Sequence, residues 1–388
     1  MKNLTASGDF TQACFLGLDV HKKTIVVAQA QGCDSPRYVA TLKHDRQTIE
    51  KFFQKIRQSN QTVFSTYEAG GCGYGLARHL KKLGITNLIA APSKIVKPKG
   101  TLKNDKHDAI HLARLLRNHV LLDQKELHEV YLPDPADEAV REKTRQRHAF
   151  KRQVQVTRNQ ILGMLTRHGK RYTLTKTHWT QTHRKWMESV RFGHPILDES
   201  FRMYLDQLHD LEARVAQCDL ELERIRQVWS KGPVVTALTA LRGISLLAAI
   251  SMVSEIGCFS RFDSAAQFMA FLGLTPSEHS SGDRVTRGRI TKKGNSKVRS
   301  LLVEASCCAY RTLKSKDVFV KKCPANLPSE LTNHAYKAQH RLYKTYWKLV
   351  HKGKNSNVAR IAVARELAGF VWAIGVASES QLQTKTTS

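Results

Sequence analysis

The sequence lacks the cysteine spacing of a zinc ribbon or a disulfide framework. Its eight cysteines are scattered over 388 residues, and no CxxC pair occurs among them. Zinc ribbons need paired cysteine ligands, and small disulfide-bonded domains need a high density of cysteines. Both classes are excluded, and reduced, mostly buried thiols are expected.

Long apolar runs are also missing from the sequence. None approaches the ~18–20 residues of a membrane span, and the N-terminal MKNLTASGDFTQACF has no apolar core of a signal peptide. These absences predict a cytoplasmic, nucleoid-associated protein without a membrane partner.

Acidic residues are scarce beside basic ones. The chain has 33 Asp and Glu against 62 Lys and Arg, which gives a formal net charge of +29. Such an excess repels itself in the compact state unless a polyanion shares the surface. Nucleic acid is the leading candidate, because each neutralised phosphate releases condensed counterions.

The first part of the chain has the pattern of an α/β domain. Strands first follow one another as hairpins and then alternate with helices, which predicts one mixed sheet covered by helices. We expect strands within 14–30, 37–44, 62–70 and 85–92, and helices over 45–58 and 73–84.

A basic helical region follows from about Ala136. Between Arg141 and Val190 there are 13 Lys and Arg against two acids, with Tyr172, Trp179 and Trp186 interleaved. Cations with aromatics suit backbone contacts and base stacking. The alternative is a solvated helix face with its aromatics in a local core.

A heptad seam then runs from Phe201 to Ile225. Its apolar residues step by three and four, with charges outside the seam. The seam can pair within the chain or with a second copy, and we favour the intermolecular coiled coil.

The remaining chain predicts an all-α domain over 231–376 and a disordered tail over 377–388. The LRGIS turn resembles a helix–hairpin–helix, whose turn offers backbone N–H groups to a phosphate. A glycine turn between two core helices has the same pattern. The segment 317–340 has no assigned function.

Four carboxylates stand where they can meet. Asp19 and Glu68 each end an expected strand, and Asp105 and Asp108 share one face of an expected helix. Clustered carboxylates are best compensated by hard cations such as Mg²⁺, two of which can activate an attacking oxygen and stabilise a leaving one. Each acid also has a structural alternative as a helix cap, first-turn residue or turn former.

A kinase-like reading of the first strand is disfavoured. Sugar kinases and actin-like ATPases use a strand, Asp and turn similar to GLDVHKKT, but they need a later Gly-rich phosphate loop. EAGGCGYG is the only candidate in the sequence for that phosphate loop. The basic helical second half of the chain does not fit the fold of these kinases and ATPases.

The stretch EHSSGD, residues 278–283, precedes the basic run RVTRGRITKKGNSKVR. Its own residues support only a polar turn, since a serine hydroxyl needs a base or metal to become a nucleophile. His279 is disfavoured as that base, because near neighbours in sequence rarely aim at one point.

Several motifs together match a known family. GLDVHKKT, YEAGGCGYG and NDKHDAIHLARLL match its three acidic motifs, and the region from LRGIS to FLGLTPSEHSSG resembles its C-terminal domain. The basic helix start ITKKGNSKVRSLLVEAS follows as it does in the family. The chain thus resembles the transposases of the insertion sequence one-ten family and its eleven-eleven group, which are bridge-RNA-guided recombinases of the DEDD type.

The resemblance implies the architecture and the assembly. It implies a RuvC-like (RNase H-like) domain over 1–135, a basic helical linker and central coiled coil over 136–230, and a C-terminal helical transposase domain over 231–376. It also implies homodimers or homotetramers around a structured guide RNA, the bridge RNA, which pairs with donor and target DNA.

The resemblance also implies the active site. Mg²⁺ is held by Asp19, Glu68, Asp105 and Asp108, and Ser281 attacks a DNA phosphate to form a covalent phosphoserine link. Ser280 is the alternative if the loop register differs. Phosphate contacts are expected from Arg284, Arg287, Arg289, Lys292, Lys293, Lys297 and Arg299.

Two rival functions stay open. One is a metal-dependent resolvase-like nuclease, in which water attacks and the serine is structural. The other is a nucleic-acid-binding scaffold whose acids serve as caps.

Overall fold

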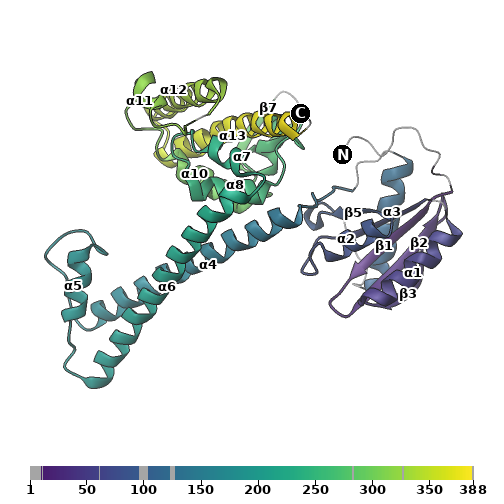
Figure 1. Cartoon of the computed structure of the whole chain (residues 1–388), viewed down its shortest axis with the longest axis horizontal. Coiled ribbons are helices and arrows are strands. Elements are labelled where there is room, and N and C mark those ends of the chain that lie inside the picture. Colours follow the sequence, from purple (N-terminus) through teal and green to yellow (C-terminus); the bar gives the residue numbers. More distant parts are fainter. Residues whose placement is uncertain are drawn as a thin grey trace. The chain divides into compact units, whose positions relative to one another are not determined.

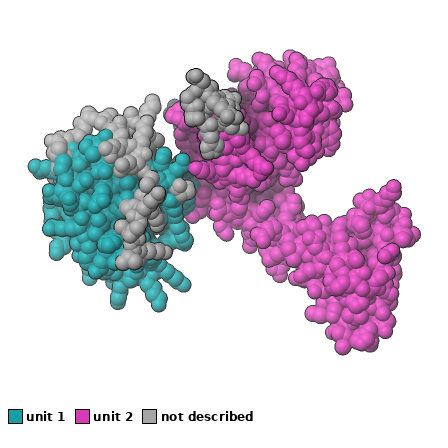
Figure 2. All heavy atoms as spheres, turned by 180° about the vertical axis from the view of Figure 1, so that it is seen from behind, with its two compact units in different colours: residues 1–133 teal, residues 134–388 magenta. Residues whose placement is uncertain are grey.

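The structure is a computed structural model that describes residues 10, 12–60, 62–95, 104–122, 127–281, 284–325 and 327–386. The chain forms two compact units, residues 1–133 and 134–388 (Figure 2). The expected boundary at residue 135 lies two residues from this division. The residues expected as a linker and a separate C-terminal domain lie together in the second unit.

The first unit is built on a five-stranded sheet in the order β3-β2-β1-β4-β5 (Figure 1). β2 pairs antiparallel with β1 and β3, whereas β4 pairs parallel with β1 and β5. The strands are β1 Cys14–Val20, β2 Thr24–Gln31, β3 Arg37–Lys43, β4 Val63–Glu68 and β5 Thr86–Ala90. The mixed α/β domain expected from the sequence is therefore present.

Helices cover both faces of this sheet. On one face Leu16, Leu18 and Tyr67 pack with apolar residues of α1 and α2, and on the other Phe15 and Phe64 pack with α3. This split follows from the alternation of side chains along a strand. The unit's helices are α1 Arg46–Ser59, α2 Gly75–Lys82, the short 3₁₀ turn η1 Pro92–Lys94 and α3 Asp105–Leu121.

The absence of a side chain at Gly17 lets α3 lie directly on β1. A Cβ atom there would lie 2.1 Å from the carbonyl oxygen of Ala109 and 2.3 Å from the backbone nitrogen of Ala113. Real Cβ atoms do not approach backbone so closely, so any other residue displaces the helix. The position matters because Asp19 follows two residues later and Asp105 begins α3.

Gly17→Ala is therefore expected to destabilise the first unit by at least ~2 kcal/mol, as overpacking of a filled contact does. Denaturant unfolding measures the change. Gly71→Ala is the matched control, because a Cβ at Gly71 meets nothing within 4 Å. The control is expected to be neutral or slightly stabilising, and equal losses in both variants would contradict the packing argument.

The second unit begins with a long antiparallel helical hairpin, α4 Pro135–Arg167 and α6 Pro195–Val228, with α5 Gln181–Ser189 between them (Figure 1). Arg147 pairs with Asp219, and Arg158 and Arg184 both bond Glu212. The seam residues Phe201, Leu208, Leu211, Cys218 and Leu222 are buried.

The α6 seam is thus covered by α4 of the same chain. The structure thus has the pairing within the chain rather than the favoured pairing with a second copy. Ile161, Met164 and Leu165 of α4 form one apolar cluster with Phe201 and Leu208 of the seam.

The aromatic residues expected to stack on bases instead pack on one another near α5. His183 is fully buried, and its ring contacts Tyr172, Trp179 and Trp186 at centroid distances of 4.7, 5.4 and 5.6 Å. Trp179 and Trp186 also pack on the local core. The alternative reading, aromatics in a local core, describes this region.

The rest of the second unit is a helical body around α13 Ser356–Thr386, which contacts α7, α9, α10 and α12. The other helices of the body are α7 Gly232–Leu238, α8 Leu246–Ile256, α9 Ala265–Phe271, α10 Ser296–Ser306, α11 Lys316–Val320 and α12 Ser329–His351. In the LRGIS turn, Gly243 has φ 97°, and a Cβ there would lie 2.4 Å from the carbonyl oxygen of Ala305. Close packing on α10 therefore accounts for this glycine.

Two expectations for this body need correction. It is not all-α, because β6 Pro276–Ser281 and β7 Arg284–Ile290 form a two-stranded antiparallel sheet. Nor is the chain disordered from residue 377, because α13 continues to Thr386. The Glu379 side chain accepts hydrogen bonds from the backbone nitrogens of Phe259 and Ser260, which fastens this end of the helix to the body.

One helix of the described chain, Ser356–Leu382 within α13, is long and apolar enough to cross a membrane by length and composition, where the sequence predicts no span. Val363, Leu367 and Val371 of this helix are buried in the core of the second unit. A core helix passes the same test, so the finding is weak evidence for a membrane segment.

Candidate active site

Two of the four expected carboxylates stand at the ends of neighbouring parallel strands. β1 and β4 pair in a register that places Leu18 opposite Tyr67, so Asp19 and Glu68 are the next residues on each strand. Leu18 and Tyr67 pack toward α1 and α2. Because side chains alternate along a strand, Asp19 and Glu68 fall on the α3 side of the sheet.

The other two carboxylates lie in the first turn of α3. Asn104 is the N-cap of this helix, and its side chain accepts a hydrogen bond from the backbone nitrogen of Lys106. Asp105 is therefore not the cap, and that structural alternative is wrong. Asp105 and Asp108 remain in the first turn, where the helix dipole favours negative charge.

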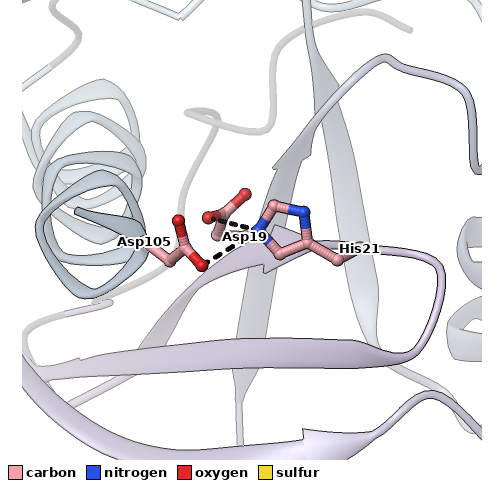
Figure 3. A group of neighbouring side chains, drawn as sticks. All are labelled: Asp19, His21 and Asp105. Carbon is pink, nitrogen blue, oxygen red and sulfur yellow. Dashed lines mark hydrogen bonds and ion pairs between the residues drawn. The ribbon is translucent and has the colours of Figure 1, made fainter. Parts of the chain in front are cut away.

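The structure adds His21 to this cluster (Figure 3). Its Nε2 atom lies 3.1 Å from Oδ2 of Asp19 and 3.3 Å from Oδ2 of Asp105. The Nδ1 atom of His44 lies 2.7 Å from the backbone oxygen of His21 and fixes the turn after β1. The sequence signal that could have identified His21 is its position two residues after Asp19 in GLDVHKKT. Side chains two residues apart along an extended chain point to the same side.

The cluster has the electrostatics of a cation site. The ligand atoms of Asp19, His21 and Asp105 lie within 4.8 Å of one another. Burial raises the pKa of Asp19, the charge of His21 lowers it, and the charges of Asp105 and Asp108 raise it, with a net rise. A divalent cation fits this donor set, because it would relieve the repulsion between the carboxylates.

The acids thus divide into two groups. Asp19 and Asp105 lie together, and Asp108 is close enough for its charge to act on Asp19. Glu68 lies at the matching position of the adjacent strand but is not among the three residues whose ligand atoms converge.

The expected nucleophile lies in the second unit. Ser281 ends β6, and its backbone pairs with Arg284 of β7, whereas Ser280 pairs with Val285. The EHSS residues therefore belong to a strand rather than to a loop. The side chains of residues 279–287 lie outside the described part of the structure, and these include His279, both serines, Arg284 and Arg287.

The base of this β-hairpin is tied to a buried carboxylate of α8. The side chain of Glu255 is 3% exposed and accepts two hydrogen bonds from Arg145 of α4 and one from Asn295. Asn295 is also the N-cap of α10, which follows the hairpin. One carboxylate therefore joins α4, α8 and the chain that leaves β7.

This network predicts a pH dependence of stability. Burial raises the pKa of Glu255. The hydrogen bonds from Arg145 and Asn295, together with nearby positive charge, lower this pKa by more than burial raises it, so the net shift is downward. A lowered pKa in the folded state gives stability that is present above the ordinary value and is lost as the pH falls through the folded value. Glu255→Gln should therefore cost about 2 kcal/mol at pH 7, and this difference should vanish in acid.

Denaturant unfolding at pH values from 7 down to about 3.5 measures the difference in unfolding free energy between the parent and the Glu255→Gln protein. Glu199→Gln is the control, since Glu199 is exposed. A Glu255→Gln effect that stays constant across this range would contradict the assignment to the charged carboxylate.

The cations expected to contact phosphates fall into two groups, those that are exposed and those that have contacts within the protein. Arg289, Lys292 and Lys293 are exposed. Lys297 lies 3.9 Å from Glu255, and burial lowers its pKa. Arg299 donates to the backbone oxygen of Leu272 at 2.7 Å. The last two cations thus have contacts that stabilise the body itself.

Comparison with known proteins adds family evidence for both units. A model described as Transposase IS116/IS110/IS902 family matches residues 235–319, and a transposase model of the DEDD type from the IS110 group matches residues 16–169. The y4qE transposase of Sinorhizobium fredii is 36% identical over 95% of this chain and 90% of its own length. The transposase of the insertion element IS1533 of Leptospira borgpetersenii is 31% identical over 63% of this chain and 70% of its own.

A family 20 transposase of Pseudomonas aeruginosa is 29% identical over 76% of this chain and 86% of its own length. The first of these relatives spans nearly the whole of both sequences. The two family models cover the acidic cluster and the β6–β7 hairpin separately. The chain belongs to the IS116/IS110/IS902 family of transposases, the enzymes that move insertion sequences by acting on DNA.

Proposed function

We propose that this transposase is an RNA-guided recombinase that cuts and rejoins DNA through a covalent bond to Ser281. Asp19, Glu68, Asp105 and Asp108 hold Mg²⁺, and a structured guide RNA pairs with donor and target DNA. The observation that carries the proposal is the convergence of Asp19 and Asp105, from a strand end and a helix start, on a point that favours a cation.

The divalent cation, when bound, supplies positive charge that lowers the cost of the developing charge on the attacking and leaving oxygens. The chain's residues provide the rest. Asp19 and Asp105 orient their oxygens toward one point, and the backbone of the turn after β1 is fixed by His44. Gly17 sets the spacing between the strand and the helix that carry these acids.

In the proposed step, Oγ of Ser281 bonds to a DNA phosphorus atom as the bond from phosphorus to one deoxyribose oxygen breaks. The hydroxyl proton leaves Oγ, and a proton is taken up by the departing oxygen. One phosphodiester replaces another with no oxidation or reduction, so the energy needed for rejoining is retained. Ser281 and the carboxylates lie in different units, so the reaction requires them to meet in the assembled complex.

The strand order β3-β2-β1-β4-β5 supports a RuvC-like assignment for the first unit. The net charge of +29 supports binding of polyanions, the class to which both DNA and a guide RNA belong. Since α4 covers the α6 seam, the proposed homodimer or homotetramer uses other surfaces.

A single assay tests the proposal. The protein is incubated with Mg²⁺, the structured RNA encoded by the element, and end-labelled DNA, and the products are separated under denaturing conditions. We expect a protein–DNA adduct that depends on both the RNA and the cation.

Other outcomes of the assay assign other functions. Cleavage without an adduct favours a metal-dependent nuclease in which water attacks. Binding without cleavage, unchanged by Asp105→Asn, favours a scaffold. An adduct that forms equally well without RNA rejects RNA guidance but retains the serine chemistry.

A further inference from the structure

Helix α12 carries a row of cations that neither the acidic cluster nor the β6–β7 hairpin uses. The helix spans Ser329–His351 and lies outside both family-model matches, which cover residues 16–169 and 235–319. It packs along α13 (Figure 1). The buried residues that make this contact include Leu331, Ala335, Ala338, Leu342 and Tyr346.

The cations lie on the opposite side of α12. Lys337, Arg341, Lys344 and Lys348 follow one another at spacings of four, three and four. At 3.6 residues per turn this pattern keeps them within roughly 60° of arc over about 16 Å of helix. We call these four residues the α12 basic row.

The row lines an open groove of about 730 Å³, whose lining also includes Tyr336, His340 and Thr345. Arg341 is the member of the row with an ion pair in the described part of the chain. Its Nε atom lies 2.9 Å from Oε2 of Glu366, which also accepts a hydrogen bond from Thr345. An ion pair through Nε leaves the two terminal nitrogens of the guanidinium for a second acceptor.

An arrangement of this kind is unfavourable in the free protein. Like charges three or four residues apart on a helix destabilise it. The row contains three such pairs, and Glu366 offsets part of the charge in the two that include Arg341. A polyanion on this face removes the repulsion and releases its own counterions. We propose that the α12 basic row is a docking surface for the sugar–phosphate backbone of duplex DNA.

The lining favours a duplex over a single strand. Proteins that bind single strands combine a charged groove with aromatic faces on which unstacked bases lie. The aromatic ring of Tyr336 instead contacts the rings of Phe319 and His340, at centroid distances of 5.5 and 4.7 Å. The groove therefore offers charge without a base platform, and the family to which the chain belongs acts on DNA.

The test measures binding of the full-length protein to a fluorescently labelled 30-bp DNA duplex in the absence of divalent cation. Fluorescence anisotropy gives the affinity at each of a series of salt concentrations. The variant is Lys337→Gln/Lys344→Gln/Lys348→Gln. The control, Lys51→Gln/Lys55→Gln/Lys81→Gln, removes the same charge from exposed positions of the first unit. Thermal melts establish that both variants fold.

The α12 variant is expected to bind DNA about tenfold or more weakly at moderate salt, with its salt slope reduced by about 2–3, whereas the control binds like the parent. Equal losses in both variants, or none in either, would overturn the proposal. A loss confined to an RNA duplex of the same sequence would overturn it in favour of RNA. The readout involves no cleavage, so it is independent of the proposed serine chemistry.

Discussion

A Ser281→Ala protein is expected to form no denaturation-resistant adduct with DNA, while it binds the same DNA as well as the parent protein does. The substitution removes one oxygen atom, so the charge that holds the DNA backbone is unchanged. Loss of the attacking group removes the covalent route altogether, and a fall of at least ~10³-fold in adduct is expected. Quantified gel separation of labelled DNA measures it.

Ser280→Ala is the matched control, because it makes the same change one residue earlier in β6. It is expected to retain adduct formation within about tenfold, since a neighbouring substitution perturbs the site without removing the nucleophile. If Ser280→Ala abolishes the adduct and Ser281→Ala does not, the nucleophile is Ser280. An adduct that survives both substitutions would contradict a serine in this strand.

The fold of the first unit could be read from the sequence because each segment has one strong pattern. Strands such as CFLGLDV are apolar and bounded by polar turns, and the helix after His44 begins at a good N-cap, Asp45. The strand-end positions of Asp19 and Glu68 and the helix-face position of Asp105 predict that distant acids can converge. The register that puts Asp19 and Glu68 on one side of the sheet comes from the structure.

The corrections concern features that depend on partners far away in the chain. A heptad seam indicates that a helix packs against another helix, but it does not identify the partner. For α6 that partner is α4 of the same chain. The β6–β7 hairpin is rich in arginine and serine, so its strands have little apolar signal, and it forms by backbone pairing. The end of α13 looks polar, but Glu379 is held by the backbone of residues 259 and 260.

His21 was missed for a different reason. A histidine near a strand end is usually an ordinary turn residue, and the clustered-carboxylate pattern drew attention to acids alone. Its role depends on the distance to Asp105, 84 residues later, which the structure supplies. The same holds for Asn104, whose capping bond excludes the capping alternative for Asp105.

Asp19→Asn is expected to abolish cation-dependent cleavage while making the cation-free protein more stable. Burial is the main cause of the raised pKa of Asp19, and the charges of Asp105 and Asp108 add to it. A carboxyl group whose pKa rises on folding stabilises the fold at low pH and loses that contribution as the pH increases through the folded value. At neutral pH its charge therefore opposes folding, and a neutral amide removes this cost.

Cleavage should fall by about 10³-fold, because the site loses an oxygen ligand and half of its converging negative charge. Thermal melts with and without Mg²⁺ or Mn²⁺ give a readout that does not depend on activity. The parent should gain stability on addition of the cation, and Asp19→Asn should start higher and gain little. Asp45→Asn is the control, since Asn caps α1 as well as Asp does.

The pairing of lost activity with gained stability is what separates a cation site from a structural ion pair. If the acids served the fold, with His21 as their partner, removal of Asp19 would lower the melting temperature. If they are held together for a cation, its removal relieves repulsion that the free protein otherwise carries. A melting temperature that falls on Asp19→Asn, with an unchanged response to cation, would contradict the site and favour the scaffold.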